Sequence, residues 1–274
     1  MSGESIHTRI WQEEPEPDNA FAAASCRCHG YDVFGDLLVH AGWIEYLFLQ
    51  FRGEAPSPHQ AKLLDGLAVA LANPGPRDPA VHAAMCGGVG GSTSASCLMA
   101  ALAVGAGAAG GAREVRLAID DWRTRGTDLA MWQTGLATKP EDDPADVWPA
   151  PGHPPGFDPY GVRCTTPVLQ TLSYLAGFGC GESLAWLRDN RSSLESAAGL
   201  PLSMTGVAAA ALFDLGCTPG EGEMLHLLLR LPGAAVHALE QKQYGHKKFP
   251  FFRAELENDP GPAPSIKDCA ESGA

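Results

Sequence analysis

The chain has 274 residues and a formal net charge of −13, with 19 lysines and arginines against 32 aspartates and glutamates. This balance argues against nucleic acid or an anionic membrane surface as the natural partner, because both repel an acidic protein. The length suffices for one large domain or two small ones with a sizeable hydrophobic core.

Cysteine use and the first residues of the chain predict its compartment. The eight cysteines stand singly among apolar or small residues, apart from Cys26 and Cys28. The chain opens with polar, acidic residues in place of the charged and apolar parts of a secretory signal. We therefore expect free thiols in a reducing cytoplasm. Residues 92–109 are too rich in Ala, Gly and Ser to predict a membrane span.

The N-terminal region contains one candidate metal motif. After a polar stretch over residues 1–20, which predicts an exposed arm, comes Cys26-Arg27-Cys28-His29. Such a run can ligate zinc, but a structural zinc site needs four ligands, and no second cluster of Cys or His lies nearby in the sequence. We favour a strand and turn that continues through residues 30–33, and we expect no metal.

The first helices are predicted in the next stretch. Residues 36–51 place apolar side chains at helical spacing. Ser57-Pro58 is typical of a helix cap and first helical position, so a second helix should follow over residues 60–71. Residues 73–79 form a turn-rich loop whose only cation, Arg77, is either a solvated side chain or a candidate for holding an anion.

The middle of the chain holds its least polar stretch. Residues 92–106 carry no charge and are small or apolar, which predicts a helix buried on every side. Gly110 and Gly111 then permit a tight turn before the next helix. A buried helix that delivers a glycine turn to the centre of a helical protein indicates a pocket there.

The second half predicts further helices, one of which contains a buried charge. A charged, Pro-rich loop is expected outside the core at residues 135–152, and a frayed tail at residues 258–274. The apolar helix predicted over residues 223–241 contains Arg230 near its midpoint. A charge in that position is costly unless it is paired, so Arg230 needs an anionic partner. The other helical patterns lie within residues 113–124, 167–187, 188–198 and 203–216.

Four stretches resemble the citrate synthase and citryl-CoA lyase family. Residues 30–33 (GYDV) are similar to its R-G-Y-D-I hairpin, and residues 49–65 (LQFRGEAPSPHQAKLLD) follow its next phrase closely. Residues 108–112 (AAGGA) resemble its L-H-G-G-A turn, and residues 230–241 (RLPGAAVHALEQ) resemble its R-x-x-G-x-x-A-H-x-x-E-Q helix.

The resemblance implies an all-α, citrate synthase-like fold with a large helical domain interrupted by a smaller one. We place the large domain at residues 1–115 and 216–274, and the smaller domain at residues 116–215. The resemblance also implies a two-fold homodimer, in which residues 92–106 form one of the interface helices.

The resemblance further implies a reaction. Members of the family make or break a carbon–carbon bond beside the thioester of an acyl-CoA, which is a substrate, so no bound cofactor is expected. In this chain Ala109 stands where the family has a histidine that polarises the thioester carbonyl. Thr205 stands where the family has the aspartate that removes the α-proton. Because threonine cannot act as a carboxylate base near pH 7, we expect Thr205 to cap a helix.

Some family roles remain with residues of the glycine turn and the last long helix. Arg230 corresponds to an arginine that binds a substrate carboxylate, although an ion pair within a dimer core would also account for it. Gly110 and Gly111 are expected to form the substrate-facing turn. A second region, Gly152-His153 followed by Asp158, is similar to the family's G-H and D-P element, which contributes a catalytic histidine.

That second region can be aligned in another way. Placing residues 155–159 on the family's P-G-x-G-H element would leave the chain without that histidine. Tyr160 occupies the place of a substrate-binding arginine, and Arg163, three residues later, is its candidate substitute.

Two hypotheses of function follow. In the first, the protein cleaves or forms a carbon–carbon bond in an acyl-CoA thioester by an altered mechanism, with Asp158 as a proton acceptor and His153 on the substrate hydroxyl. In the second, the protein is a non-catalytic relative that binds a CoA ester or a partner protein.

Overall fold

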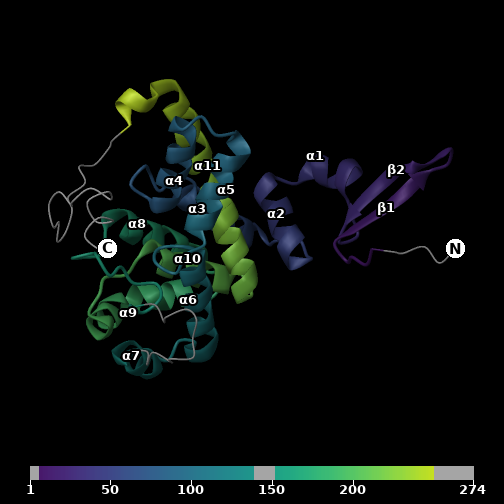
Figure 1. Cartoon of the computed structure of the whole chain (residues 1–274). Helices are drawn as coiled ribbons and strands as arrows, with labels where there is room; N and C mark the ends of the chain where they lie inside the picture. The colour runs from purple at the N-terminus through teal and green to yellow at the C-terminus, as the bar shows by residue number, and fades with distance from the viewer. Residues whose placement is uncertain (1–5, 139–151, 250–274) are drawn as a thin grey trace, which may run out of the picture.

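The structure, a computed structural model, describes residues 6–138 and 152–249, and it is mainly helical (Figure 1). The tail predicted at residues 258–274 and most of the loop predicted at residues 135–152 therefore lie outside the described residues. Residues 135–137, at the start of that loop, belong to a helix instead.

A small antiparallel sheet forms the N-terminal region and projects from the helical body (Figure 1). Its strands are β1 (Trp11–Glu16), β2 (Asn19–Cys28) and β3 (Tyr31–Asp32), in the order β1-β2-β3. His29 and Gly30 connect β2 to β3 with φ of +47° and +89°, as a two-residue hairpin turn requires. The predicted strand and turn are thus confirmed, and part of the predicted arm is an exposed strand.

Helices and the loops between them make up the rest of the described chain. The helices are α1 (Leu38–His40), α2 (Trp43–Arg52), α3 (Pro58–Leu71), α4 (Pro79–Val89), α5 (Ser94–Gly105), α6 (Ala112–Arg125), α7 (Leu129–Ala137), α8 (Thr166–Leu175), α9 (Ser183–Ala198), α10 (Met204–Asp214) and α11 (Pro219–Tyr244). A π-helical turn, Val33–Leu37, precedes α1, and 3-10 turns lie at Ala176–Phe178 and His246–Lys248.

Two local predictions about the early helices have different outcomes. The cap at Ser57 is confirmed, because its side chain accepts a hydrogen bond from the Gln60 N–H. The continuous helix predicted over residues 36–51 is wrong, because Ala41 and Gly42 have extended backbones that separate α1 from α2. The Glu45 carboxylate accepts the Gly42 N–H at 2.6 Å and thereby starts α2.

The centre of the core is α10, whose residues 205–212 are all buried. It contacts α6 and α9 most extensively, and also α3, α8 and α11. By contrast, α5 buries only Cys97, Ala101 and Gly105, one stripe at a spacing of four residues. The prediction that this segment is buried on every side is therefore wrong for the single chain, since Met99 is 67% and Val104 is 46% exposed.

The long helix α11 brings the loop after α3 close to its own middle. Pro232 lies inside the helix and has no N–H group, and the next N–H, of Gly233, donates to the Ala72 carbonyl at 2.7 Å. A Cβ at Gly233 would lie 2.8 Å from the Asn73 Cα, so only glycine permits this approach. Within the described ranges, no helix is both long and apolar enough to cross a membrane.

Candidate functional site

A cavity of about 580 Å³ lies where several segments distant in sequence meet. Its wall is built from the end of α3 and the following loop, the glycine turn before α6, the loop over residues 157–160, and the starts of α8 and α10. The first half of α11 closes it. The polar and charged residues of the wall are Asn73, Asp78, Glu114, Asp158, Tyr160, Thr165, Ser203, Thr205, His226 and Arg230.

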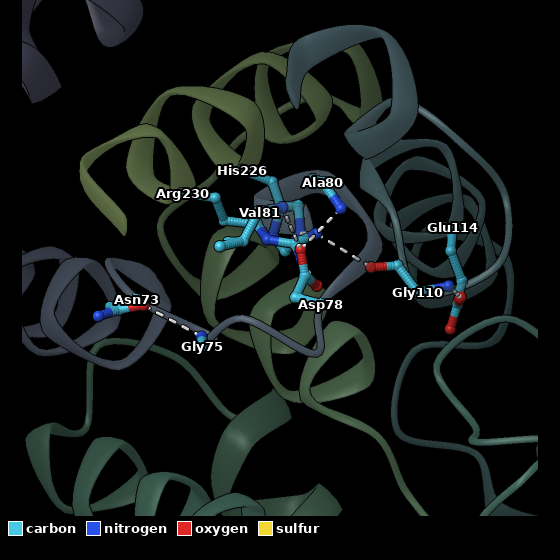
Figure 2. A network of polar contacts seen from close by, with 9 residues as sticks. All are labelled: Asn73, Gly75, Asp78, Ala80, Val81, Gly110, Glu114, His226 and Arg230. Atoms are coloured by element: carbon cyan, nitrogen blue, oxygen red, sulfur yellow. Dashed lines mark hydrogen bonds and ion pairs between the residues drawn. The ribbon is translucent and has the colours of Figure 1, made fainter. Parts of the chain in front are cut away.

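The Glu114 carboxylate ties three of these segments together. Its side chain is almost completely buried, and it accepts the Gly110 N–H at 2.5 Å, the Gly156 N–H at 2.9 Å and the Thr205 hydroxyl at 2.6 Å (the first is drawn in Figure 2). The His153 Nε2 lies 3.6 Å from the same Glu114 oxygen that accepts the Gly110 N–H. Because a buried carboxylate is tolerated only when it is hydrogen-bonded or paired, these contacts fix the turn, the loop and α10 relative to one another.

Glycines make this arrangement possible. Gly110 has φ of +73°, and a Cβ at Gly111 would lie 2.3 Å from the Gly107 carbonyl oxygen. The turn therefore closes tightly before α6, so that Glu114 lies in the first turn of that helix, where the helix dipole favours a carboxylate. A Cβ at Gly156, whose φ is +89°, would lie 2.9 Å from the Gly206 Cα, which holds the loop directly on the start of α10.

Arg230 is the centre of a second polar network (Figure 2). Its guanidinium donates to the Asp78 carboxylate, to the Gly110 carbonyl at 3.1 Å and to the His226 Nε2 at 3.4 Å. The two charged side chains are only 12% and 14% exposed. The predicted need for an anionic partner is thus met within the same chain, by Asp78. The other oxygen of Asp78 accepts the N–H groups of Ala80 and Val81 at the start of α4.

His226 is a neutral imidazole in this network. It is 1% exposed, and burial together with the charge of Arg230 lowers its pKa to about 3. Since Arg230 donates to Nε2, the proton of the neutral ring is on Nδ1. That atom is buried and has no hydrogen-bond partner in the described part of the chain.

The residues proposed from the sequence fall into two groups. Arg230, Asp158 and Gly110 lie on the cavity wall. Gly111 is buried at the N-terminus of α6 and is not part of the wall. Arg77 and Arg163 are exposed and do not belong to the wall.

His153 does not reach the cavity. It is buried behind Glu114, and the wall at this place is made by Phe157, Asp158 and Pro159. These belong to the segment that the alternative alignment places on the family's histidine-containing element. Asp158 accepts the Tyr160 N–H at 2.9 Å through one carboxylate oxygen.

Sequence reasoning missed Glu114, Asp78 and His226. Glu114 looked like one of several charges on an amphipathic helix, and Asp78 looked like a loop residue, although its position before Pro79 is typical of a helix cap. His226 lies four residues before Arg230, a spacing that places both on one helix face and that signalled their contact.

The helix-cap role expected of Thr205 is wrong. Ser203 occupies the cap position of α10, and the Thr205 hydroxyl donates to Glu114. Across residues 6–138 and 152–249, no three His, Cys, Asp or Glu side chains come together in a way that could hold a metal ion.

Comparison with known proteins shows the fold. No family model matches the sequence, and no curated protein sequence matches it. Among solved structures, a citryl-CoA lyase from Hydrogenobacter thermophilus superposes with a TM-score of 0.74 at 18% identity, over 98% of this chain and 100% of that one.

Two other structures agree. An ATP citrate lyase from Methanothrix soehngenii, in complex with citrate and coenzyme A, gives a TM-score of 0.70 at 16% identity, over 97% of this chain and 43% of that one. A citrate synthase from Thermoplasma acidophilum gives 0.55 at 11% identity, over 83% and 60%. The chain therefore has a citrate synthase-like, mainly helical fold, as predicted, in which the small sheet is a minor part.

Replacing the buried carboxylate should destabilise the protein. In Glu114→Gln, an uncharged amide replaces the acceptor of three hydrogen bonds, and its NH₂ group cannot accept the N–H that faces it. We expect the free energy of unfolding to fall by about 2–4 kcal/mol, measured by urea denaturation. The exposed Glu54→Gln is the matched control and should change it by less than about 0.5 kcal/mol. Equal stabilities of the two variants would contradict the role of Glu114.

Burial of His226 predicts a pH dependence of stability. Its pKa is lower in the folded protein than in the unfolded chain, so between about pH 3 and 6.5 the unfolded chain binds the extra proton. The free energy of unfolding should therefore fall as the pH falls below about 6.5, with a contribution from this residue approaching about 1.4 kcal/mol per pH unit. Urea denaturation at several pH values should show a shallower dependence for His226→Gln than for the natural protein. The exposed His59→Gln controls for the loss of a histidine as such, and an unchanged slope in His226→Gln would refute the assignment.

Proposed function

We propose that the protein acts on an acyl-CoA thioester by cleaving or forming a carbon–carbon bond beside the thioester carbonyl, with a substrate or mechanism altered from that of citrate synthases and citryl-CoA lyases. The observation that carries this proposal is the cavity between the glycine turn, the start of α10 and the middle of α11, with the Asp158 carboxylate in its wall. It lies in a fold shared along its whole length with a citryl-CoA lyase.

Ordinary citrate chemistry is not expected. Ala109 lies on the cavity wall, and its methyl side chain cannot donate a hydrogen bond to an enolate oxygen. Thr205 is also on the wall, but its hydroxyl already donates to Glu114. Loss of a general base costs about 10²–10⁴ in rate, and loss of a stabilising donor costs about 10²–10³.

Asp158 is the proposed proton acceptor in a retro-aldol cleavage. The two other carboxylates of the described wall are engaged, Asp78 with Arg230 and Glu114 with three donors. Asp158 is left to accept the proton of a substrate hydroxyl. His153 would act on the substrate only indirectly, through the carboxylate of Glu114.

The alternative is a non-catalytic protein that binds a CoA ester or a partner protein. The same two replacements, Ala109 and Thr205, favour it, together with the internal pairing of Arg230. The catalytic hypothesis requires turnover of a CoA ester, whereas the alternative requires only that a CoA ester or a partner protein binds.

Binding and turnover assays test the proposal. We expect acetyl-CoA to bind in isothermal titration calorimetry, and we expect no citrate from acetyl-CoA plus oxaloacetate at ordinary synthase rates. Release of acetyl-CoA and an aldehyde or ketone from a 3-hydroxyacyl-CoA, lost in Asp158→Asn with acetyl-CoA binding retained, would support catalysis. Binding without cleavage would support the non-catalytic alternative. Failure of any CoA ester to bind would refute the proposed function, and citrate formation at synthase rates would refute the roles inferred for Ala109 and Thr205.

We further propose that the protein is a cytoplasmic homodimer, in which a second copy covers the outer face of α5. Met99 and Val104 are exposed on that helix, and Leu239 of α11 is 51% exposed beside it. Exposed apolar side chains on two adjacent helices are typical of a surface that is buried in an assembly.

A charge on α5 should separate the subunits. We expect Met99→Lys combined with Val104→Lys to convert a dimer into a monomer, because two unpaired charges in a dimer interface are costly. Light scattering coupled to size-exclusion chromatography measures the mass. Met131→Lys, a similar change of an exposed apolar residue on α7, should leave the dimer intact. A natural protein with the mass of one chain, or a dimer unaffected by the α5 substitutions, would refute this interface.

A further inference from the structure

We propose that Asp78 makes the cavity selective against polycarboxylate ligands. The acyl group that the cavity accepts is then an uncharged 3-hydroxyacyl group. This inference deepens the proposed function and rests on it for the thioester. The proposal begins from the charges of the wall and from how they are paired.

The described wall carries an excess of negative charge. Three carboxylates, of Asp78, Glu114 and Asp158, face one cation, Arg230. His226 adds no charge, because burial keeps its imidazole neutral at pH 7. A ligand that carries several carboxylates would therefore meet more repulsion than attraction in a partly buried space, where charge interactions are stronger than in water.

Arg230, the one cation of the described wall, already makes hydrogen bonds within the chain. One nitrogen of the Arg230 guanidinium donates to Asp78, and another donates to the Gly110 carbonyl and the His226 Nε2. An incoming carboxylate would have to displace Asp78. That side chain is anchored from its other oxygen, which accepts two N–H groups of α4 (Figure 2).

The remainder of the wall suits an uncharged acyl chain. Leu71, Phe157, Val168 and Met204 provide apolar surface, and Asp158 is the carboxylate outside both networks. A 3-hydroxyacyl thioester satisfies both features, since its alkyl part contacts the apolar residues and its hydroxyl donates to Asp158.

The corresponding reaction needs no other reactant. Asp158 takes the hydroxyl proton, the bond between the α- and β-carbons breaks, and its electron pair passes to the thioester as an enolate while the β-carbon becomes a carbonyl. The proton then returns from Asp158 to the α-carbon. A 3-hydroxyacyl thioester thus becomes an acetyl thioester and an aldehyde or ketone, and all atoms and electrons are accounted for.

The test compares two thioesters on two variants. Isothermal titration calorimetry is performed with 3-hydroxybutyryl-CoA and with citryl-CoA on the natural protein, on Asp78→Asn and on Asp65→Asn. Asparagine keeps an oxygen that can cap α4, so the fold should be retained, which circular dichroism checks. Asp65→Asn makes the same charge change on an exposed residue of α3, away from the cavity.

We expect the natural protein and Asp65→Asn to bind 3-hydroxybutyryl-CoA at least about tenfold more tightly than citryl-CoA. Asp78→Asn should reduce this preference by at least about tenfold, because it removes the like charge that is paired with Arg230, where a substrate carboxylate would have to bind. Equal binding of the two thioesters by the natural protein, or an unchanged preference in Asp78→Asn, would overturn the proposal.

Free citrate separates this inference from the proposed function. If neither thioester binds, the proposed function fails, and titration with citrate alone still tests Asp78. Tighter citrate binding by Asp78→Asn than by the natural protein and Asp65→Asn supports its selective role. The absence of such a gain overturns it.

Discussion

The buried carboxylate of Glu114 is the constraint on which the rest of the site depends. Its donors come from the turn at Gly110, the loop at Gly156 and the helix at Thr205, so one side chain organises segments up to 91 residues away in sequence. Removing a carboxylate from water is unfavourable by several kcal/mol unless hydrogen bonds replace its hydration. The folded state is therefore favoured only when all three segments are in place, and the glycines at 110, 156 and 206 allow them to approach closely enough.

The peptide groups around Gly110 link this network to that of Arg230. The Gly110 N–H donates to Glu114, while its carbonyl accepts from Arg230, which is also paired with Asp78. The glycine turn is thus held from both sides by charged groups of α6 and α11. This explains in physical terms how the chain keeps the shape of the turn around Ala109, whose own side chain makes no polar contact. The shape of the turn is maintained by Glu114 and Arg230, neither of which requires a ligand for its pairing.

Features that depend on neighbouring residues could be predicted from the sequence, whereas features that depend on distant partners could not. The hairpin after Cys28, the cap at Ser57 and the requirement of Arg230 for an anion all follow from local chemistry. The identity of that anion does not, because Asp78 is 152 residues away. The composition of α5 likewise shows that its surface is apolar, but not whether that surface packs within one chain or against another. Burial of Glu114 escaped prediction for the same reason, since its helix has charges on other faces.

These two networks also limit the chemical roles that can be assigned to the residues of the cavity wall. A buried ion pair or carboxylate that is fully satisfied by its own chain is explained by folding alone and gives no evidence of a ligand. Glu114, Asp78 and Arg230 are all satisfied in this way, so their presence on the wall is expected even in a protein without activity. A chemical role must therefore rest on Asp158, which stands outside both networks, and on the open volume beside it. The described wall, whose one cation is neutralised from within, also differs from a site built to attract a polycarboxylate, and this difference supports the proposed change of substrate.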